Sequence, residues 1–110
     1  MKAQDIIDEI SNWEIDKKNE FLERFLKDMT IMNRAIWGDN EYNDSEKLNC
    51  LKWSNELAHR IWNLKFDLER GIDEASQTKF LNHLNFYRKQ EPKLGGHLGA
   101  TLKSTYNYVK

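Results

Sequence analysis

The chain has 110 residues, of which 32% are charged and 39% hydrophobic, with one proline, five glycines and one cysteine. This length fits a single domain, and the composition excludes a collagen-like, disulfide-rich or membrane-spanning chain. The lone Cys50 cannot close an intramolecular disulfide, and the N-terminus has no apolar run typical of a signal peptide. We therefore expect a cytoplasmic protein with no membrane partner.

The net charge of −1 argues against a general polyanion binder, but it hides an uneven distribution. Residues 1–75 carry eleven basic and seventeen acidic side chains, a net charge of −6. Residues 76–110 carry six basic side chains and one acidic side chain, a net charge of +5. The C-terminal third is therefore a candidate surface for an acidic partner or for the acidic part of the same chain.

The N-terminal half predicts a short helix followed by a long one. Three isoleucines at Ile6, Ile7 and Ile10 indicate the short helix. Ser11 and Glu14 have the spacing of a capping box, which predicts a first main helix over about 12–37 that ends before Gly38. Its apolar stripe repeats at intervals of three, four and seven residues and comprises Ile15, Leu22, Phe25, Leu26, Met29, Asn33 and Ile36.

Two further main helices are expected after the polar linker 38–44. A capping box of Asn43 and Glu46 begins the second helix, over about 45–70, and Gly71 ends it. Its predicted stripe comprises Cys50, Leu57, Ile61, Leu64 and Leu68. Asp73 can cap the third helix, over about 73–90, which ends before Pro92. Long helices joined by a short linker pack antiparallel, so the fold class is all-α, an up-down helical bundle of three main helices.

The sequence divides into a bundle domain over 1–92 and a tail over 93–110. Gly95, Gly96 and Gly99 predict a glycine-rich turn that lets the basic, aromatic tail fold back on the bundle or on a partner. The rest of the tail fits either of two patterns. Leu98, Leu102, Tyr106 and Val109 follow helical spacing, whereas Leu102, Ser104, Tyr106 and Tyr108 follow strand spacing.

The second main helix has an unusually wide apolar face. At about 100° per residue its apolar side chains cover roughly 220°, whereas a helix packed on one side needs little more than about 100°. One explanation is that this helix is central and touches both long neighbours. The other is that an edge of Leu48, Trp62 and Phe66 is an oligomer or partner surface. Phe86 also projects from the expected solvent side of its helix.

The sequence offers few groups for catalysis or metal binding. Glu56 and His59 have the Glu-x-x-His spacing of bundle metal sites, but they lie on the expected solvent face and no second such pair exists. Cys50 falls on the apolar stripe, where a buried and inert thiol is common. His83 has no evident nucleophile beside it. We therefore expect no enzyme activity and no cofactor, with a small metal-binding bundle protein as a second alternative.

These features predict a small, non-enzymatic protein-binding or regulatory module that self-associates as a homodimer or docks another protein. The candidate partner-binding residues are Trp62, Phe66, Phe86, Arg88, Lys89, Lys93, Lys103, Tyr106 and Tyr108. The first alternative is a nucleic-acid-binding protein. Basic groups interleaved with the tyrosines of the tail suit phosphate attraction and base stacking on a single strand.

Overall fold

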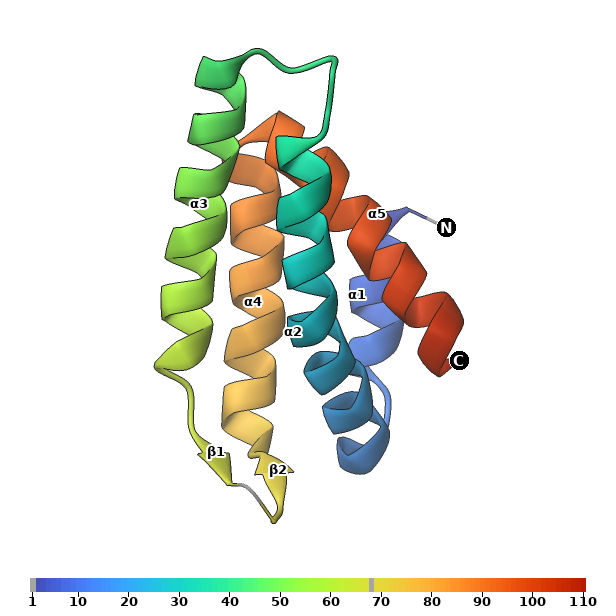
Figure 1. The fold of residues 1–110 in the computed structure, drawn as a ribbon. Coiled ribbons are helices and arrows are strands. Elements are labelled where there is room, and N and C mark those ends of the chain that lie inside the picture. Colours follow the sequence, from blue (N-terminus) through green and yellow to red (C-terminus); the bar gives the residue numbers. More distant parts are fainter. Residues whose placement is uncertain (1, 68) are drawn as a thin grey trace.

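Five helices and one antiparallel hairpin make up the fold in a computed structural model that describes residues 2–67 and 69–110 (Figure 1). The helices are α1 (Ala3–Ser11), α2 (Ile15–Trp37), α3 (Asp44–Trp62), α4 (Glu74–Gln90) and α5 (Pro92–Val109), and the hairpin strands are β1 (Phe66–Asp67) and β2 (Gly71–Ile72). The all-α bundle is thereby confirmed. In the described part of the chain, no helix combines the length and the apolar character needed to cross a membrane.

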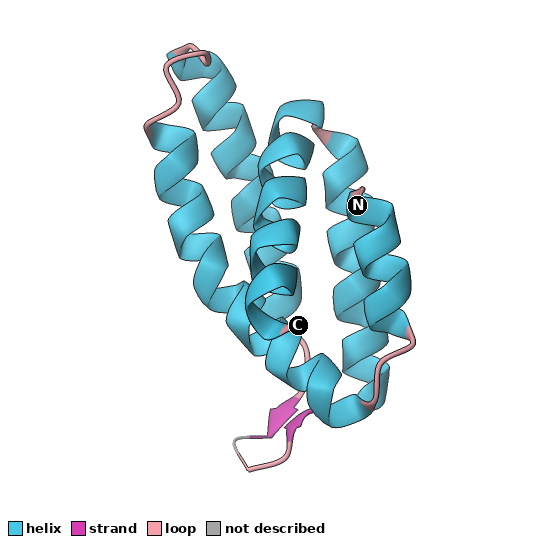
Figure 2. Ribbon diagram, turned by 90° about the vertical axis from the view of Figure 1, so that its right-hand side faces the viewer, coloured by secondary structure: helices cyan, strands magenta, loops and turns pink. Residues whose placement is uncertain are grey.

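Helices α4 and α5 each contact all four other helices. Helices α2 and α3 run antiparallel and are joined by a loop at one end of the bundle, and the hairpin lies at the opposite end (Figures 1 and 2). Helix α3 lies at the edge of the bundle in Figure 1. Helix α3 contacts both of its long neighbours, α2 and α4, as the first explanation of its wide apolar face predicts, and it also contacts α5. Leu48, Trp62 and Phe66 nevertheless remain exposed.

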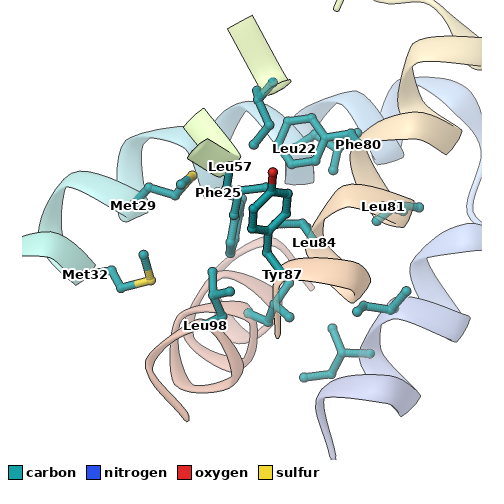
Figure 3. Close-up of a cluster of buried hydrophobic side chains, with 14 of the residues drawn as sticks. Leu22, Phe25, Met29, Met32, Leu57, Phe80, Leu81, Leu84, Tyr87 and Leu98 are labelled. Carbon is teal, nitrogen blue, oxygen red and sulfur yellow. The ribbon is translucent and has the colours of Figure 1, made fainter. Parts of the chain in front are cut away.

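The core forms where α4 meets its neighbours (Figure 3). Leu22 and Phe25 of α2 lie beside Phe80, Leu84 and Tyr87 of α4, with Leu57 of α3 and Leu98 of α5 around them, and Leu81 extends from the other side of α4. The rings of Phe25 and Phe80 pack edge to face with centroids 6.3 Å apart, a geometry favoured by the aromatic quadrupole. The three isoleucines of α1 are buried, as their spacing predicts.

Two of the three predicted helix starts are confirmed. The side chain of Asn43 accepts a hydrogen bond from the Glu46 amide at 2.9 Å, and the Glu46 side chain accepts one from the Asn43 amide at 3.0 Å. Asp73 accepts a hydrogen bond from the Ser76 amide at 2.7 Å. The capping box at Ser11 is wrong, because Ser11 is the last residue of α1 and its hydroxyl donates to the Ile7 carbonyl at 2.7 Å.

The predicted helix over 45–70 is too long, since α3 ends at Trp62 and the chain turns into the hairpin. The Asp67 side chain accepts hydrogen bonds from the amides of Glu69 at 2.9 Å and Arg70 at 3.3 Å, which stabilises a turn in competition with a helix. Gly71 then has a φ of +83°, a conformation that glycine adopts without strain. Leu68 of the predicted stripe lies outside the described residues.

A buried amide network fixes the hairpin to the bundle. The Ile72 amide donates to Asn19 Oδ1 at 2.9 Å, and Gln77 Nε2 donates to the same oxygen at 2.9 Å. Gln77 Nε2 also lies 3.1 Å from the Ile15 carbonyl. A Cβ on Gly71 would lie 2.7 Å from Asn19 Nδ2, so this close approach also requires glycine. The network ties α2, the hairpin and α4 together.

The expected glycine-rich turn is wrong, because all of its glycines lie within α5. Pro92 occupies the first turn, where a missing amide hydrogen costs nothing, and the Glu91 side chain accepts from the Lys93 amide at 3.2 Å. The helical spacing of the tail is confirmed, since Leu98, Leu102 and Tyr106 are buried. Gly95 approaches the end of α4 so closely that a Cβ would lie 2.3 Å from the Arg88 carbonyl oxygen.

Two alanine substitutions in α5 should have opposite effects on stability. Gly95→Ala forces a methyl group against the Arg88 backbone and should lower the free energy of unfolding by about 1–3 kcal/mol. At Gly96 a Cβ meets nothing within 4 Å, so Gly96→Ala should raise it by about 0.5–1 kcal/mol through helix propensity. Urea denaturation followed by circular dichroism measures both changes. Equal effects of the two substitutions would contradict this close contact between α4 and α5.

Candidate functional site

Exposed apolar side chains gather on one face of the bundle. In the described part of the chain, the exposed large hydrophobic residues are Ile15, Ile31, Trp37, Leu48, Trp62, Phe66, Phe86 and Tyr108. Single exposed apolar residues are ordinary, but a contiguous group marks an interaction surface. Ile15, Trp37, Leu48, Trp62 and Phe66 all line depressions along α2, α3 and the hairpin.

These three neighbouring depressions are together called the α2–α3 groove. Its middle part, about 450 Å³, is bounded by Leu26, Ala58, Trp62 and Phe66. Phe66 also lines the part at the hairpin end, about 700 Å³, which reaches Ile15. Asn33 is shared with the part at the loop end, also about 700 Å³, which lies between Trp37 and Leu48. The shared residues Phe66 and Asn33 make the depressions neighbours on the surface.

The most exposed side chain of the groove is Trp62, with 78% of its surface accessible. It is the last residue of α3, and the chain leaves the helix there for the hairpin, so no following turn covers the indole. Phe66 on β1 is also exposed and faces the same part of the groove. An indole and a phenyl ring in one apolar depression are typical of an anchoring site for a partner.

The middle of the groove contains one polar bridge between the two helices. The Ser54 hydroxyl donates to Asn33 Oδ1 at 2.7 Å. Ser54 is buried, and Asn33 is half-buried where it lines the groove. This hydrogen bond gives Asn33, the polar residue in the predicted α2 stripe, a structural role. It also satisfies the buried Ser54 hydroxyl.

Charged groups of both signs border the groove at its two ends, and at the loop end these include Lys52 as well as Glu56. At the hairpin end, Lys65 and Arg70 are exposed. Asp67 and Asp73 at the same end accept hydrogen bonds from nearby backbone amides, and those bonds lower the pKa of Asp73 below its ordinary value. At the loop end, Glu56 lines the groove.

Of the predicted partner-binding residues, the structure brings Trp62 and Phe66 together in the groove. Phe86 lies on α4, is exposed, and packs edge-on against its neighbour Tyr87 with ring centroids 5.2 Å apart. Phe86 lines none of the three parts of the groove. It therefore belongs to a different part of the surface.

The basic and aromatic residues of the C-terminal third are divided among separate contacts. Lys89 and Lys103 are exposed, whereas half-buried Arg88 donates to Gln4 at 2.8 Å and to Asn85 at 2.7 Å.

Lys93 forms an ion pair with Glu46, so the start of α5 is bound to the start of α3. Tyr106 is only 4% exposed and stacks on Trp13 at 5.9 Å. The guanidinium of Arg24 lies 3.9 Å from the ring centroid of Tyr108. The tyrosines and lysines of α5 therefore do not present the row of open rings that base stacking requires.

Of the residues considered for chemistry, Glu56 and His59 line the loop-end part of the groove, and Cys50 and His83 lie outside the groove. Cys50 is fully buried, and burial raises the pKa of its thiol, which keeps it protonated and unreactive. Glu56 and His59 point to solvent, as predicted. Among residues 2–67 and 69–110, no group of three or more His, Cys, Asp or Glu side chains is arranged to hold a metal ion. Burial, together with the cationic Arg60 and Lys79, holds the pKa of His83 below 6.5.

Trp37 and Ile15 are groove residues that the sequence did not indicate. Both lie at ends of α2, where the 3.6-residue period assigns a face but not the neighbour that covers it. Ile15 was assigned to the core stripe, yet it is exposed. The available signal was the excess width of the apolar face on the next helix, which pointed to Leu48 and Trp62.

The environment of His83 predicts a measurable titration. Its imidazole should titrate below pH 6.5 in the folded protein, and Arg60→Gln should raise that pKa because it removes a nearby positive charge. As the pH falls, the His83 imidazole of the unfolded chain becomes protonated at a higher pH than that of the folded chain. The contribution of His83 to stability is therefore complete above about pH 6.5 and decreases as the pH falls. NMR titration of the imidazole protons measures the shift, with Arg34→Gln on α2 as the control. An unchanged His83 pKa in Arg60→Gln would contradict this environment.

Comparisons of the chain with protein-family models, with curated proteins and with solved structures found no match.

Proposed function

We propose that this chain is a non-enzymatic protein-binding module that docks a partner on the α2–α3 groove. The observation that carries the proposal is that Ile15, Trp37, Leu48, Trp62 and Phe66, all exposed, line three neighbouring depressions. The middle and loop-end parts of the groove are lined by α2 from Leu26 to Trp37, a distance of about 16 Å or about three helical turns. A shallow apolar groove of this length suits a partner helix with apolar residues at intervals of three and four.

Trp62 is the expected centre of the binding energy. Its side chain is 78% exposed, so docking removes roughly 150–200 Å² of aromatic surface from water. At about 25 cal/mol per Å², that transfer is worth about 4–5 kcal/mol before the entropic costs of association are subtracted. Lys27 and Thr30 lie at the border of the same part of the groove and can remain hydrated.

The non-enzymatic part of the proposal is supported by the surroundings of the reactive side chains. The Cys50 thiol is buried with a raised pKa, and His83 lies among cationic groups that disfavour a bound metal ion. Neither residue lines the groove. The groove itself offers apolar surface and hydrogen-bonding groups, which suit recognition better than bond cleavage.

Replacement of Trp62 by glutamate should abolish partner binding and leave the fold intact. The indole is exposed at the end of α3, so Trp62→Glu removes an anchor without opening the core. Immobilised wild-type chain should retain a protein from a lysate of its native cell, either another protein or untagged copies of itself. Trp62→Glu should retain it at least tenfold less. Quantitative mass spectrometry of the eluates measures the difference.

The matched control is Ile31→Glu, which introduces the same charge at another exposed apolar side chain, outside the groove. It should retain the partner as the wild type does. Circular dichroism should give the same helix content for all three chains. The proposal is overturned if Trp62→Glu retains every protein that the wild-type chain retains, including copies of the chain itself. It is also overturned if the wild-type chain retains no protein at all.

A further inference from the structure

We propose that the outer face of α4, together with the adjoining edge of α3, binds single-stranded nucleic acid through phosphate contacts to Arg60 and Lys79 and a base stacked on Phe86. This surface, here called the α4 face, comprises Arg60, Lys79, Asn82, His83, Phe86, Lys89 and Gln90. None of these residues lines any part of the α2–α3 groove. The proposal therefore does not rest on the docking function.

The basic and aromatic residues of α4 lie on one side of that helix. At about 100° per residue, Lys79, His83 and Phe86 fall within about 60° of one another. Lys79 and Phe86 are exposed, and His83 is half-buried. From Lys79 to Lys89 the helix advances about 15 Å, the length of about four stacked nucleotides at roughly 3.4 Å each. The face is therefore long enough for a short stretch of a single strand.

Arg60 reaches the same face from α3. The two helices lie side by side and run antiparallel (Figure 1), with the rings of Trp53 and Tyr87 in contact at 5.9 Å. Arg60 follows Trp53 by two helical turns on the same side of α3, and the corresponding level on α4 lies between Lys79 and His83. Burial, then Arg60 and Lys79, lower the pKa of His83, and no carboxylate in the described part of the chain opposes them. The centre of the face is therefore positive.

The nearest carboxylates lie along the two sides of the face. Residues 75–90 contain no Asp or Glu. On the α3 side, exposed Glu56 lies about one turn before Arg60, and among the described residues the two form no ion pair. On the α1 side, the Asp8 carboxylate accepts a hydrogen bond from Gln4 at 2.9 Å.

The remaining carboxylates lie at the two ends of α4. Glu74, in the first turn, lies about 140° around the helix from Lys79. Beyond the last turn, the Glu91 side chain accepts a hydrogen bond from Asn49 of α3. The carboxylates of the hairpin lie before the first turn of α4. A strand laid along the face thus crosses its basic middle and meets acidic groups only at the borders.

The exposed phenyl ring favours a nucleic acid over an acidic protein. Phe86 is 53% exposed, so a base can stack on the open part of its ring. Asn82 and Gln90, about one turn to either side, present exposed amides that can bond to a base or a phosphate. An acidic helix would meet one exposed large apolar side chain among the described residues of this face, too few for a helix-in-groove contact.

Fluorescence anisotropy with a labelled oligothymidylate of about 12 nucleotides tests the proposal. At about 50 mM salt the wild-type chain should bind with a Kd of about 1–100 µM, the range of non-specific binding. Phe86→Ala should raise the Kd at least about fivefold, because a stacked base is lost. Lys79→Gln should reduce the slope of log K against log salt by about 0.7, the value of one phosphate contact. A wild-type chain that binds no oligonucleotide up to about 200 µM at this salt overturns the proposal.

Matched controls separate the α4 face from charge in general. Lys103→Gln removes one exposed positive charge from α5, and Trp62→Ala removes the aromatic anchor of the groove without a change of charge. Both should bind the oligonucleotide as the wild type does, and all variants should keep the wild-type helix content by circular dichroism. An unchanged affinity in Phe86→Ala overturns the proposal, as does an equal loss in Lys103→Gln and Lys79→Gln.

Two further measurements locate the site and identify the ligand class. The oligonucleotide should shift the NMR signals of the His83 imidazole and leave those of His97, which is bound to Asp39 at the other side of the bundle, unchanged. A His83 signal that does not move overturns the proposal. Polyglutamate at equal charge should fail to displace the oligonucleotide. Its displacement would assign the face to an acidic polypeptide instead.

The two functions of the chain fail separately. Phe86→Ala should lose oligonucleotide binding and still retain the protein that docks on the groove. Trp62→Ala should show the opposite behaviour. A chain in which either substitution abolishes both activities contradicts two separate surfaces and overturns the assignment of nucleic acid to the α4 face.

Discussion

The packing of α4 and α5 against each other and against the other three helices is the constraint on which the rest of the structure depends. Helix α4 is a mostly polar sequence whose buried side chains include Phe80, Leu81, Leu84 and Tyr87, and each of its neighbours covers part of it. Because α5 must lie close to α4, Gly95 approaches the Arg88 backbone. Because α1, α2 and α5 crowd the other sides, α3 remains at the edge. Its outer apolar residues are left to form one wall of the α2–α3 groove.

The parts of the fold that depend on neighbours in sequence could be predicted. The caps at Asn43 and Asp73 need a partner only three residues away, and the core stripe of α2 follows from helical periodicity. The end of α3 could not be found in this way, because the hairpin is fixed by the bond from Ile72 to Asn19, 53 residues earlier. The first part of helix α5 was predicted as a turn for a similar reason, whereas helical spacing from Leu98 onward was one of the two predicted patterns. Its glycines disfavour a helix locally, and burial of Leu94, Leu98 and Leu102 overrides that preference.

The candidate site was predictable to the extent that it depends on apolar excess. Too many apolar residues on one helix pointed to Trp62 and Phe66, although Phe66 reaches the groove from the hairpin and not from the helix. The distribution of charge along the sequence predicted the candidate site less well than the apolar residues did. The basic and aromatic side chains of the C-terminal third do not form one surface, since Lys93 pairs with Glu46 and Tyr106 packs into the core. A charge count along the sequence does not reveal which side chains a helix turns inward.

The amide network around Asn19 has a consequence for the rate of docking. Phe66 pairs across the hairpin with Ile72, whose amide is bound to Asn19, and Gln77 holds the same oxygen from α4. One end of the groove is therefore preorganised before any partner arrives, and little conformational entropy remains to be lost there on binding. Association then has no folding step to wait for, so differences in affinity among variants of the groove should reside mainly in how slowly the complex separates.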